Sequence, residues 1–207
     1  ERMFEFTQLQ PEESDENAEN REFTFSRITL NSIAFRFPGQ KLLLSDVNLE
    51  IEKGTASALV GESGSGKSTL VNILMRFYQP ESGSVKVNSA IPCQYVSLDS
   101  WRRSIGLIPQ EIHLFNGTVL ENIVPDADEG KIRKLASMTI EYGLEPFIKS
   151  LPMGFATLTG EDGVKLSGGQ KQVIAFMRAL INEPDILLID EGTSGMVMAQ
   201  HHTVGIV

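Results

Sequence analysis

Residues 61–69 of this 207-residue chain read GESGSGKST, which fits the pattern G-x-x-x-x-G-K-[ST] of a phosphate-binding loop. Glycines let such a loop curl until successive backbone N–H groups point inward at phosphate oxygens. The pattern therefore predicts a nucleoside triphosphate, ATP or GTP, bound together with Mg²⁺. The residues of the loop are Gly61, Glu62, Ser63, Gly64, Ser65, Gly66, Lys67, Ser68 and Thr69.

Two side chains of this loop have predicted roles of their own. Lys67 would reach the β- and γ-phosphates, and the Ser68 hydroxyl would hold Mg²⁺. The helix expected after the loop adds the positive end of its dipole. Lys67 is therefore expected to act on the transferred phosphate, and Ser68 on the metal ion.

The sequence on either side of the loop has the order that phosphate binding needs. Residues 55–60, TASALV, are short, mostly apolar and strand-like. After the loop, apolar residues recur at the i, i+3, i+4, i+7 spacing of one helix face, at Leu70, Ile73, Leu74 and Phe77. A strand, a glycine loop and a helix in this order favour a phosphate site over the alternative, a chance glycine-rich turn.

The composition is that of a globular domain. Hydrophobic residues make up 41% of the chain and charged residues 22%, as in ordinary globular proteins with one full core. No run approaches the roughly 20 apolar residues of a membrane span, and no secretory signal is visible, so we expect a soluble domain. Cys93 is the only cysteine, so an internal disulfide is excluded and Cys93 alone makes no metal site.

The net charge of −9 is concentrated at the start of the chain. Residues 1–22 contain eight acidic residues and two arginines, which leaves −3 for the rest. Because residues 11–20 lack apolar periodicity, we expect residues 1–25 to form an acidic, solvated linker. The nearly neutral remainder has no electrostatic footprint for nucleic acid, and no nucleic-acid partner is expected.

Strand patterns surround the phosphate loop. Residues 28–37 and 42–51 are expected to form two antiparallel strands before it. After it, residues 82–83 (Ser-Gly) are typical of a turn, and residues 84–88 and 105–108 of two short strands.

The second half of the chain begins with a helical pattern. Residues 118–151 are expected to be helical, with Asp126 or Asp128 capping a helix and residues 145–151 forming a short one. The apolar residues of the capped helix are Ile132, Leu135 and Ile140. Strands that alternate with helices indicate an α/β sheet.

A long helix and two strands are expected near the end of the chain. Ser167 opens the helix, which ends near Asn182, and residues 185–190 form a buried strand. Residues 203–207 are also strand-like. The apolar face of the helix contains Val173, Phe176, Met177, Leu180 and Ile181.

Two carboxylates follow the buried strand. In an α/β sheet, ligands bind just beyond the carboxyl ends of the strands, where Asp190 and Glu191 are expected. Asp190 suits a Mg²⁺ ligand, and Glu191 can orient or deprotonate an attacking water. The alternative is two solvated charges at a strand end, but the phosphate loop upstream favours the catalytic interpretation.

The run LSGGQ at 166–170 is the third motif. A serine before two glycines at a helix start offers a hydroxyl, free N–H groups and a helix dipole to an anion. An ordinary N-cap is the alternative, although capping does not need two glycines, which weaken the first turn. Since the chain already has one phosphate loop, the second anion site suggests that the γ-phosphate is gripped from elsewhere, a second copy being one candidate.

With these motifs the chain resembles the nucleotide-binding domain of ATP-binding cassette (ABC) transporters from about residue 28 to residue 194. Residues 166–170 match that family's signature sequence, and the order of phosphate loop, glutamine loop, signature and acidic strand is the same. The resemblance implies a phosphate-loop NTPase core with a mixed sheet, an N-terminal antiparallel β-subdomain, and a helical subdomain at about 112–166 with the signature. The ATPase domain would span residues 26–207.

The resemblance assigns further residues to the ATP site. Phe37, thirty residues before Lys67, stands where the family places an aromatic ring on adenine; from the residues alone, a strand-end core aromatic is equally plausible. Gln110 matches the glutamine that touches Mg²⁺ and the attacking water. The signature residues Ser167, Gly168, Gly169 and Gln170 would contact ATP held by a second nucleotide-binding domain, identical or homologous, packed head to tail.

Three further stretches are similar to exporter sequences. Residues 157–163, TLTGEDG, look like the T-x-x-G-E-x-G run near the contact with transmembrane coupling helices. Residues 101–106 and 114–119 are similar to exporter sequence around the glutamine loop. The resemblance therefore implies a transmembrane partner domain and a location on the cytoplasmic face of a membrane.

The chain departs from the family pattern after Glu191. Val197 stands where the family has an aspartate, so the loop that contacts the opposite site is in doubt. His201 and His202 come too early to be the family's switch histidine, and we expect them to be surface residues. Because residues 203–207 resemble the strand before that histidine, we expect about twenty family residues to be missing before Thr203 and the domain to be incomplete at its end.

The leading hypothesis is an ATPase that dimerises around two ATP molecules with Mg²⁺ to power an exporter. The departures keep a second hypothesis open, a nucleotide-gated binding module with little hydrolysis. A soluble ABC-type ATPase is a third, although Lys67 and Ser167 are only 100 residues apart, with no coiled coil between them. A small-molecule kinase would leave the signature without a purpose.

Overall fold

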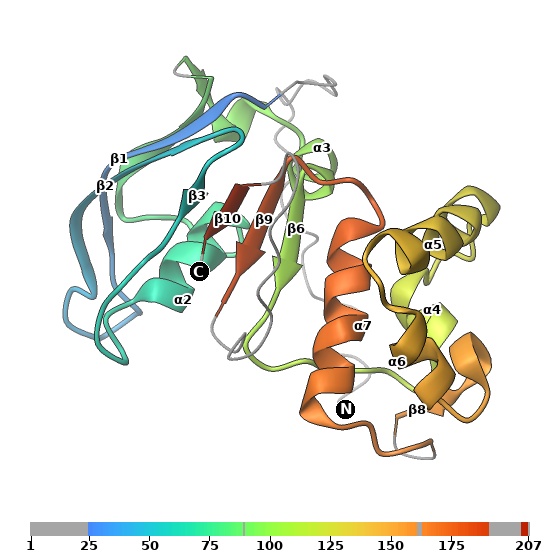
Figure 1. Cartoon of the computed structure of the whole chain (residues 1–207). Helices are drawn as coiled ribbons and strands as arrows, with labels where there is room; N and C mark the ends of the chain where they lie inside the picture. Colours follow the sequence, from blue (N-terminus) through green and yellow to red (C-terminus); the bar gives the residue numbers. More distant parts are fainter. Residues whose placement is uncertain (1–24, 89, 161–162, 191–203, 207) are drawn as a thin grey trace, which may run out of the picture.

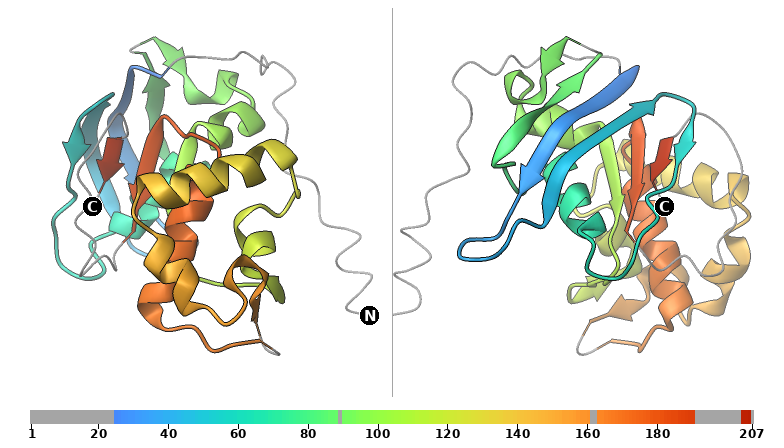
Figure 2. Two further views of the ribbon diagram at one scale, coloured as in Figure 1. Left: turned by 45° about the vertical axis from the view of Figure 1, so that its right-hand side comes forward. Right: turned by 90° about the vertical axis from the view of Figure 1, so that its left-hand side faces the viewer.

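The structure is a computed structural model that describes residues 25–88, 90–160, 163–190 and 204–206. An antiparallel sheet, a parallel sheet and a group of helices lie side by side (Figure 1). The views of Figure 2 show the parallel sheet between the other two parts. Among the described residues, no helix has the length and apolarity needed to cross a membrane. The acidic stretch at residues 1–24 lies outside the described residues.

The antiparallel sheet has the strand order β2-β1-β4-β5. Strands β1 (Arg27–Phe35) and β2 (Leu44–Glu52) are antiparallel, as the sequence predicts, and Ile28, Leu30 and Ile33 of β1 are buried. The other two strands are β4 (Ser82–Val87) and the short β5 (Ile91–Pro92).

The prediction of a turn at Ser82-Gly83 is wrong, because both residues begin strand β4. Gly83 has φ +93, and a Cβ there would lie 2.5 Å from the carbonyl oxygens of Asn31 and Ser32. The pairing register between β1 and β4 shifts between Asn31 and Ala34. The glycine therefore permits a close approach of two backbones at an irregular point of the sheet.

The parallel sheet has the order β3-β10-β9-β6, with β3 (Ala56–Ser57), β10 (Val204–Ile206), β9 (Ile186–Ile189) and β6 (Ile105–Ile108). Successive residues of a strand point to opposite faces. Ile186 and Leu188 accordingly join one hydrophobic cluster, and Leu187 and Ile189 the other. Both faces of this sheet are therefore covered, which explains why β9 is a continuous apolar run.

The strand expected over residues 55–60 is limited to the two residues of β3. Its pairing with β10 involves only Ala56 and Ser57, opposite Gly205 and Ile206. Val60 is 95% exposed. The strand expected at 203–207 is present as β10, between β3 and β9.

Helix α2 (Lys67–Leu74) follows the phosphate loop and packs Leu70, Ile73 and Leu74 into the first hydrophobic cluster. Phe77 does not continue this face, contrary to the sequence prediction. The helix ends at Met75, since Arg76 takes the left-handed conformation at φ +57. Phe77 is half exposed, and the Arg102 guanidinium lies 4.9 Å from the centre of its ring.

Three helices occupy the stretch expected to be helical: α4 (Val119–Ile123), α5 (Glu129–Glu141) and α6 (Glu145–Ser150). Of the two candidate caps, Asp128 is the N-cap of α5 and accepts the Lys131 N–H at 2.8 Å. Ile140 was expected on the apolar face but is 68% exposed, while its neighbours Met138 and Thr139 are buried. The buried stripe of α5 is thus displaced by one to two residues.

Helix α7 (Gly168–Leu180) covers the second face of the parallel sheet (Figure 1). Its contact with β6 is close, because a Cβ on Gly106 would lie 2.7 Å from the Ala179 carbonyl oxygen. The remaining elements are short: α3 (Leu98–Arg103), the two-stranded sheet of β7 (Gly117–Thr118) and β8 (Leu158–Thr159), and the 3₁₀ turns Cys93–Tyr95 and Gly154–Ala156.

Candidate functional site

The phosphate loop lies between β3 and α2, and its glycines have conformations that suit its predicted role. Gly64 and Gly66 have φ +80 and +94, which side-chain-bearing residues rarely adopt. Gly66 is the N-cap residue of α2, and a Cβ there would lie 2.6 Å from Cδ2 of Leu44. At Gly61 a Cβ would meet Ser65 Oγ at 2.9 Å. The loop therefore needs glycine for conformation and for space.

Lys67 crosses the loop that precedes it. Its Nζ donates to the carbonyl oxygens of Gly61 at 2.9 Å and Glu62 at 3.0 Å. Residues 61–65 are exposed, whereas Gly66 and Thr69 are buried. A cation thus lies over an exposed loop at a helix N-terminus, an arrangement that suits a polyphosphate.

Ser68 and Asp190 meet although they come from different elements. The Ser68 hydroxyl on α2 donates to Asp190 Oδ1 at 2.9 Å, and both residues are half-buried. Asp190 directly follows β9, and its backbone N–H donates to the Ile108 carbonyl of β6 at 2.9 Å. The hydroxyl and the carboxylate are hard oxygen donors of the kind that Mg²⁺ prefers, so these residues fit that ion.

Of two further residues predicted for the site, Gln110 and Glu191, the structure describes only Gln110. Gln110 is exposed and stands two residues beyond Ile108, the residue that pairs with Ile189 at the end of β9. It is therefore at the same edge of the parallel sheet as Asp190. Glu191 lies outside the described residues and stays a prediction.

Phe37 is half-buried in an aromatic cluster beside the loop. Its ring lies edge-on to Phe35 at 5.1 Å and to Tyr78 at 5.6 Å between ring centres. The hairpin that contains Phe37 returns through Leu43 and Leu44, whose side chains would be the nearest neighbours of a Cβ on Gly66. The structure thus brings this cluster near the phosphate loop, as an adenine contact requires, and also gives Phe37 a packing role.

The LSGGQ run caps helix α7. Ser167 Oγ accepts the Gln170 N–H at 3.3 Å, and Gln170 Oε1 accepts the Ser167 N–H at 2.9 Å, which completes a capping box. None of the described residues requires glycine at the two positions after Ser167. Gly168 and Gly169 have no positive φ, and a Cβ on either would meet no atom within 4 Å.

Ser167 is not brought together with Lys67 in one chain. Helix α2 packs on the face of the parallel sheet that bears Ile186 and Leu188, and α7 packs on the face that bears Leu187. Figure 1 shows the two helices on either side of β9 and β6. The phosphate loop and the LSGGQ run are therefore separate surfaces of the chain.

Comparison with known proteins agrees with this geometry. The sequence model of the family described as ABC transporter matches residues 44–194. The chain belongs to the ABC transporter family. The resemblance inferred from the motifs is thereby confirmed, and with it the α/β phosphate-loop NTPase fold. Among the described residues, strands of both directions are present, in separate antiparallel and parallel sheets.

Individual ABC transporters match almost the whole chain. An ATP-dependent lipid A-core flippase of Hahella chejuensis (strain KCTC 2396) is 41% identical over 197 residues, 92% of this chain and 33% of its own length. A heavy metal tolerance protein of Schizosaccharomyces pombe (strain 972 / ATCC 24843) is 38% identical over 197 residues, 95% of this chain and 24% of its own. The chain thus spans a third or less of these relatives.

A solved ABC transporter has the same fold. The structure of a bacterial Atm1-family ABC exporter with ATP bound superposes with a TM-score of 0.83 at 30% identity, covering 100% of this chain and 38% of that one.

The structure of this ABC transporter chain also reveals residues that the sequence analysis did not single out. Trp101 is buried, and its Nε1–H donates to the Leu74 carbonyl at the end of α2, at 2.7 Å. Asn122 is completely buried and bonded to Arg178 of α7. The sequence carries no signal for the second pair, because Asn122 follows the charged Glu121 in the helix VLENI and its burial is visible only in the structure.

Two hollows lie outside the phosphate loop. One, about 690 Å³, is lined by residues of the segment after Gln110, by Gly160 and residues 164–166, and by Lys171 near the start of α7. Its lining includes His113, Phe115, Asn116, Val164 and Leu166. We call it the groove.

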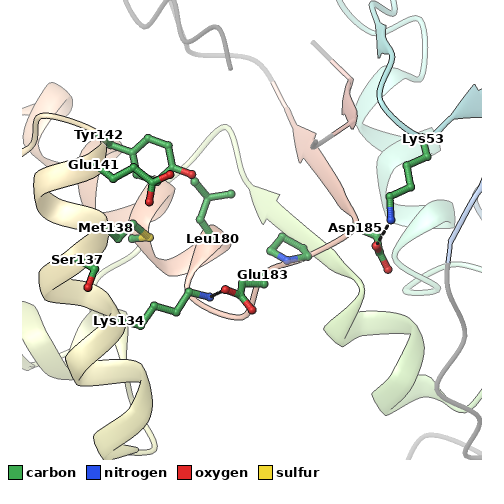
Figure 3. Close-up of a pocket in the computed structure, with 10 residues that line it drawn as sticks. Lys53, Lys134, Ser137, Met138, Glu141, Tyr142, Leu180, Glu183 and Asp185 are labelled. Carbon is green, nitrogen blue, oxygen red and sulfur yellow. Dashed lines mark hydrogen bonds and ion pairs between the residues drawn. The ribbon is translucent and has the colours of Figure 1, made fainter. Parts of the chain in front are cut away.

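The other hollow, about 640 Å³, lies beside α5 and the connection from α7 to β9 (Figure 3). Its two lysines are paired, Lys134 with Glu183 at 2.9 Å and Lys53 with Asp185 at 3.1 Å. It lies at the start of β9, opposite the end that bears Asp190, and is no part of the phosphate site.

Proposed function

We propose that this chain is the ATP-binding and ATP-hydrolysing domain of an ABC exporter. The observation that carries the proposal is the 2.9 Å contact between Ser68 and Asp190. This contact joins the start of the phosphate-loop helix to the carboxyl end of strand β9. A nucleotide site of this kind needs oxygen ligands for Mg²⁺ next to the loop that binds the phosphates. The ATP-dependent relative and the ATP-bound exporter structure support the same conclusion.

Each residue of the site has one task in this proposal. Loop N–H groups and Lys67 bind the β- and γ-phosphates, for which Lys67 must exchange the Gly61 and Glu62 carbonyls for phosphate oxygens. Ser68 and Asp190 hold Mg²⁺, which when bound neutralises charge that develops on the phosphates. Glu191 and Gln110 orient the attacking water, and Glu191 accepts its proton. Phe37 offers the edge or the face of its ring to the adenine of ATP.

The same proposal includes a second nucleotide-binding domain. Since α2 and α7 cover opposite faces of the parallel sheet, Ser167 is not available to the ATP held by its own chain. Ser167, Gly168 and Gly169 are all exposed at the start of α7, and no neighbour in the described part of the chain requires the two glycines. We infer that a head-to-tail partner brings phosphate against this helix start, where a side chain at 168 or 169 would be in the way.

The remaining partner is a transmembrane domain. The groove combines half-exposed apolar side chains, Phe115 and Val164, with Gly160 of the TLTGEDG stretch. We propose that the groove, within a helical subdomain at about 112–166, receives a helix of that domain on the cytoplasmic face of a membrane. Because relatives named for lipid A-core flipping and for heavy metal tolerance match to a similar degree, we place the choice of cargo in the membrane domain.

The test is a glycine substitution at the predicted dimer contact. In a Glu191→Gln background that retains ATP, dimer formation is measured by analytical ultracentrifugation, and ATP affinity with a fluorescent analogue. We expect Gly169→Ala to abolish the ATP-driven dimer, leave ATP affinity within twofold and raise helix stability by about 1 kcal/mol. Gly130, which occupies the same second position of helix α5, is the matched control, and Gly130→Ala should dimerise normally.

Two results would contradict parts of the proposal. An ATP-driven dimer that forms equally well with Gly169→Ala would remove the assigned contact. Steady-state phosphate release near zero in the unsubstituted chain, with ATP affinity intact, would instead favour the nucleotide-gated binding module.

A further inference from the structure

Asn122 on α4 is a completely buried side chain at the junction of four segments. Its Nδ2 group shares two N–H donors among three acceptors within hydrogen-bond distance, the carbonyl oxygens of Phe115 at 3.0 Å and Thr118 at 3.1 Å and Thr159 Oγ1 at 3.0 Å. Its Oδ1 accepts the Phe115 N–H at 3.1 Å. One amide therefore holds the segment before β7, the strand β8 and the start of α4 together, with every polar atom satisfied.

Arg178 connects this junction to helix α7. Its Nε donates to the Asn122 carbonyl at 2.7 Å, Nη2 to Asn122 Oδ1 at 3.0 Å, and Nη1 to the His113 carbonyl at 3.2 Å. The guanidinium carbon lies 5.6 Å from the centre of the Phe115 ring. All three acceptors are neutral, and none of the ion pairs among the described residues includes Arg178.

A half-buried cation without a carboxylate is costly, and desolvation accordingly lowers the pKa of Arg178. The planar fork of arginine presents three separate nitrogens to three acceptors on two segments, whereas the N–H groups of a lysine all extend from one nitrogen. The position thus needs arginine for its geometry rather than for charge pairing.

Two residues of this network belong to the wall of the groove. His113, Phe115 and Asn116 line it, and Gly160 lies so close that a Cβ there would overlap the Asn116 side chain, 1.9 Å from its Oδ1. The lining also includes Leu166, two residues before α7, and Lys171 near the start of this helix. One part of the lining therefore continues directly into α7, and Arg178 hydrogen-bonds the His113 part to the same helix.

We infer that Asn122 and Arg178 are positioning residues that fix the His113–Asn116 wall of the groove to helix α7, so that the groove and the Ser167 end of the helix move as one body. From Arg178 to Ser167 the helix spans about 16 Å at 1.5 Å per residue. The inference rests on the proposed function, since Ser167 matters only if it meets the ATP of a second domain.

Four substitutions test this inference: Arg178→Met, Arg178→Lys, Asn122→Asp and, as a control, Arg133→Met. Arg178→Met removes the fork and keeps an unbranched side chain. Arg178→Lys restores a single donor, and Asn122→Asp keeps the acceptor for Arg178 but loses the donors to Phe115, Thr118 and Thr159. Arg133 is exposed on α5 and outside the network.

The first measurement is hydrogen exchange of the nucleotide-free chain. We expect Arg178→Met to speed exchange of the Phe115 amide and of the first turn of α7 at least tenfold, while α2 and β1 keep their protection. Unchanged exchange at Phe115 and in α7 would overturn the inference, and this measurement does not depend on ATP.

The second measurement separates positioning from a purely structural role. In the Glu191→Gln background, Arg178→Met should leave the ATP affinity of the monomer within twofold but weaken the ATP-driven dimer at least tenfold. Arg178→Lys and Asn122→Asp should give intermediate losses, and Arg133→Met none. Parallel loss of ATP affinity and α2 protection would mean general destabilisation and overturn the inference. Absence of a dimer in the unsubstituted protein would count against the proposed function instead.

Discussion

The Ser68 hydroxyl and the Asp190 carboxylate, 122 residues apart in sequence, form a 2.9 Å hydrogen bond at the start of helix α2. The contact depends on the parallel pairing of β9 with β6 and on the packing of α2 against the face of β9 that bears Ile186 and Leu188. Both groups are oxygen donors, and they lie one residue from Lys67 and one from Glu191. In the proposed function, the contact thereby joins two distant motifs that supply the phosphate, metal and water ligands.

Removing the Ser68 hydroxyl should weaken the binding of ATP with Mg²⁺ but not the binding of ATP alone. We expect Ser68→Ala to weaken ATP binding ten- to a hundredfold with Mg²⁺, which corresponds to a hydrogen bond to a charged group of about 1.5–3 kcal/mol. Without Mg²⁺ the affinity should change little. Isothermal titration calorimetry measures both, and Ser63→Ala is the matched control, since only its backbone N–H is expected to contact phosphate.

Glu191→Gln should nearly stop turnover and leave ATP binding intact. A positioned general base typically contributes a factor of about 10²–10⁴ to the rate, and the amide cannot take a proton from water. Phosphate release in the steady state and equilibrium binding of a fluorescent ATP analogue measure the two effects. Hydrolysis at the full rate in this variant would remove Glu191 from its role.

Gly66→Ala and Gly54→Ala should lower the free energy of unfolding by different amounts, although both glycines have positive φ. The left-handed conformation costs a residue with a side chain about 1–2 kcal/mol in either case. At Gly54 a Cβ meets nothing within 4 Å, whereas at Gly66 it falls 2.6 Å from Leu44. We therefore expect Gly66→Ala to lower the free energy of unfolding by a further 1–3 kcal/mol or so, and to reduce ATP affinity. Equal losses of stability would show that Leu44 moves aside freely.

Trp101→Phe should destabilise the end of the phosphate-loop helix. The substitution keeps a buried ring but leaves the Leu74 carbonyl without the indole donor, which costs about 1–3 kcal/mol for a buried group. Urea unfolding followed by circular dichroism measures the loss. Tyr95→Phe, on a half-exposed ring, is the control and should change stability by less than about 0.5 kcal/mol.

The capping box of α4 should contribute a pH-dependent stability. Hydrogen bonds from the Thr118 N–H and hydroxyl lower the pKa of Glu121 in the folded chain. The contribution of the Glu121 carboxylate to the stability is therefore present above the ordinary glutamate pKa of about 4.3. It is lost as the pH falls through the lower pKa that Glu121 has in the folded chain. The difference in unfolding free energy between the unsubstituted chain and Glu121→Gln should shrink from neutral to acid pH.

Local patterns predicted much of the fold because their causes are local. The alternation of Ile28 and Leu30 predicts β1, and Ser167 before two glycines predicts the start of α7. Where a neighbour in space decides the conformation, the same reasoning was wrong. Gly83 belongs to a strand because it passes close to the backbone of Asn31, and the helix stops before Phe77 because Arg76 turns left-handed.

The sequence alone determined the chemistry of this chain, because a phosphate loop, an acidic strand end and the LSGGQ run each need only a few neighbouring residues. Tertiary structure alone decided how they combine. It brought Ser68 to Asp190, placed Ser167 across the sheet from Lys67, and buried Asn122 against Arg178. The physical reason is that strand pairing and the choice of sheet face are long-range packing outcomes, which no short stretch of residues encodes.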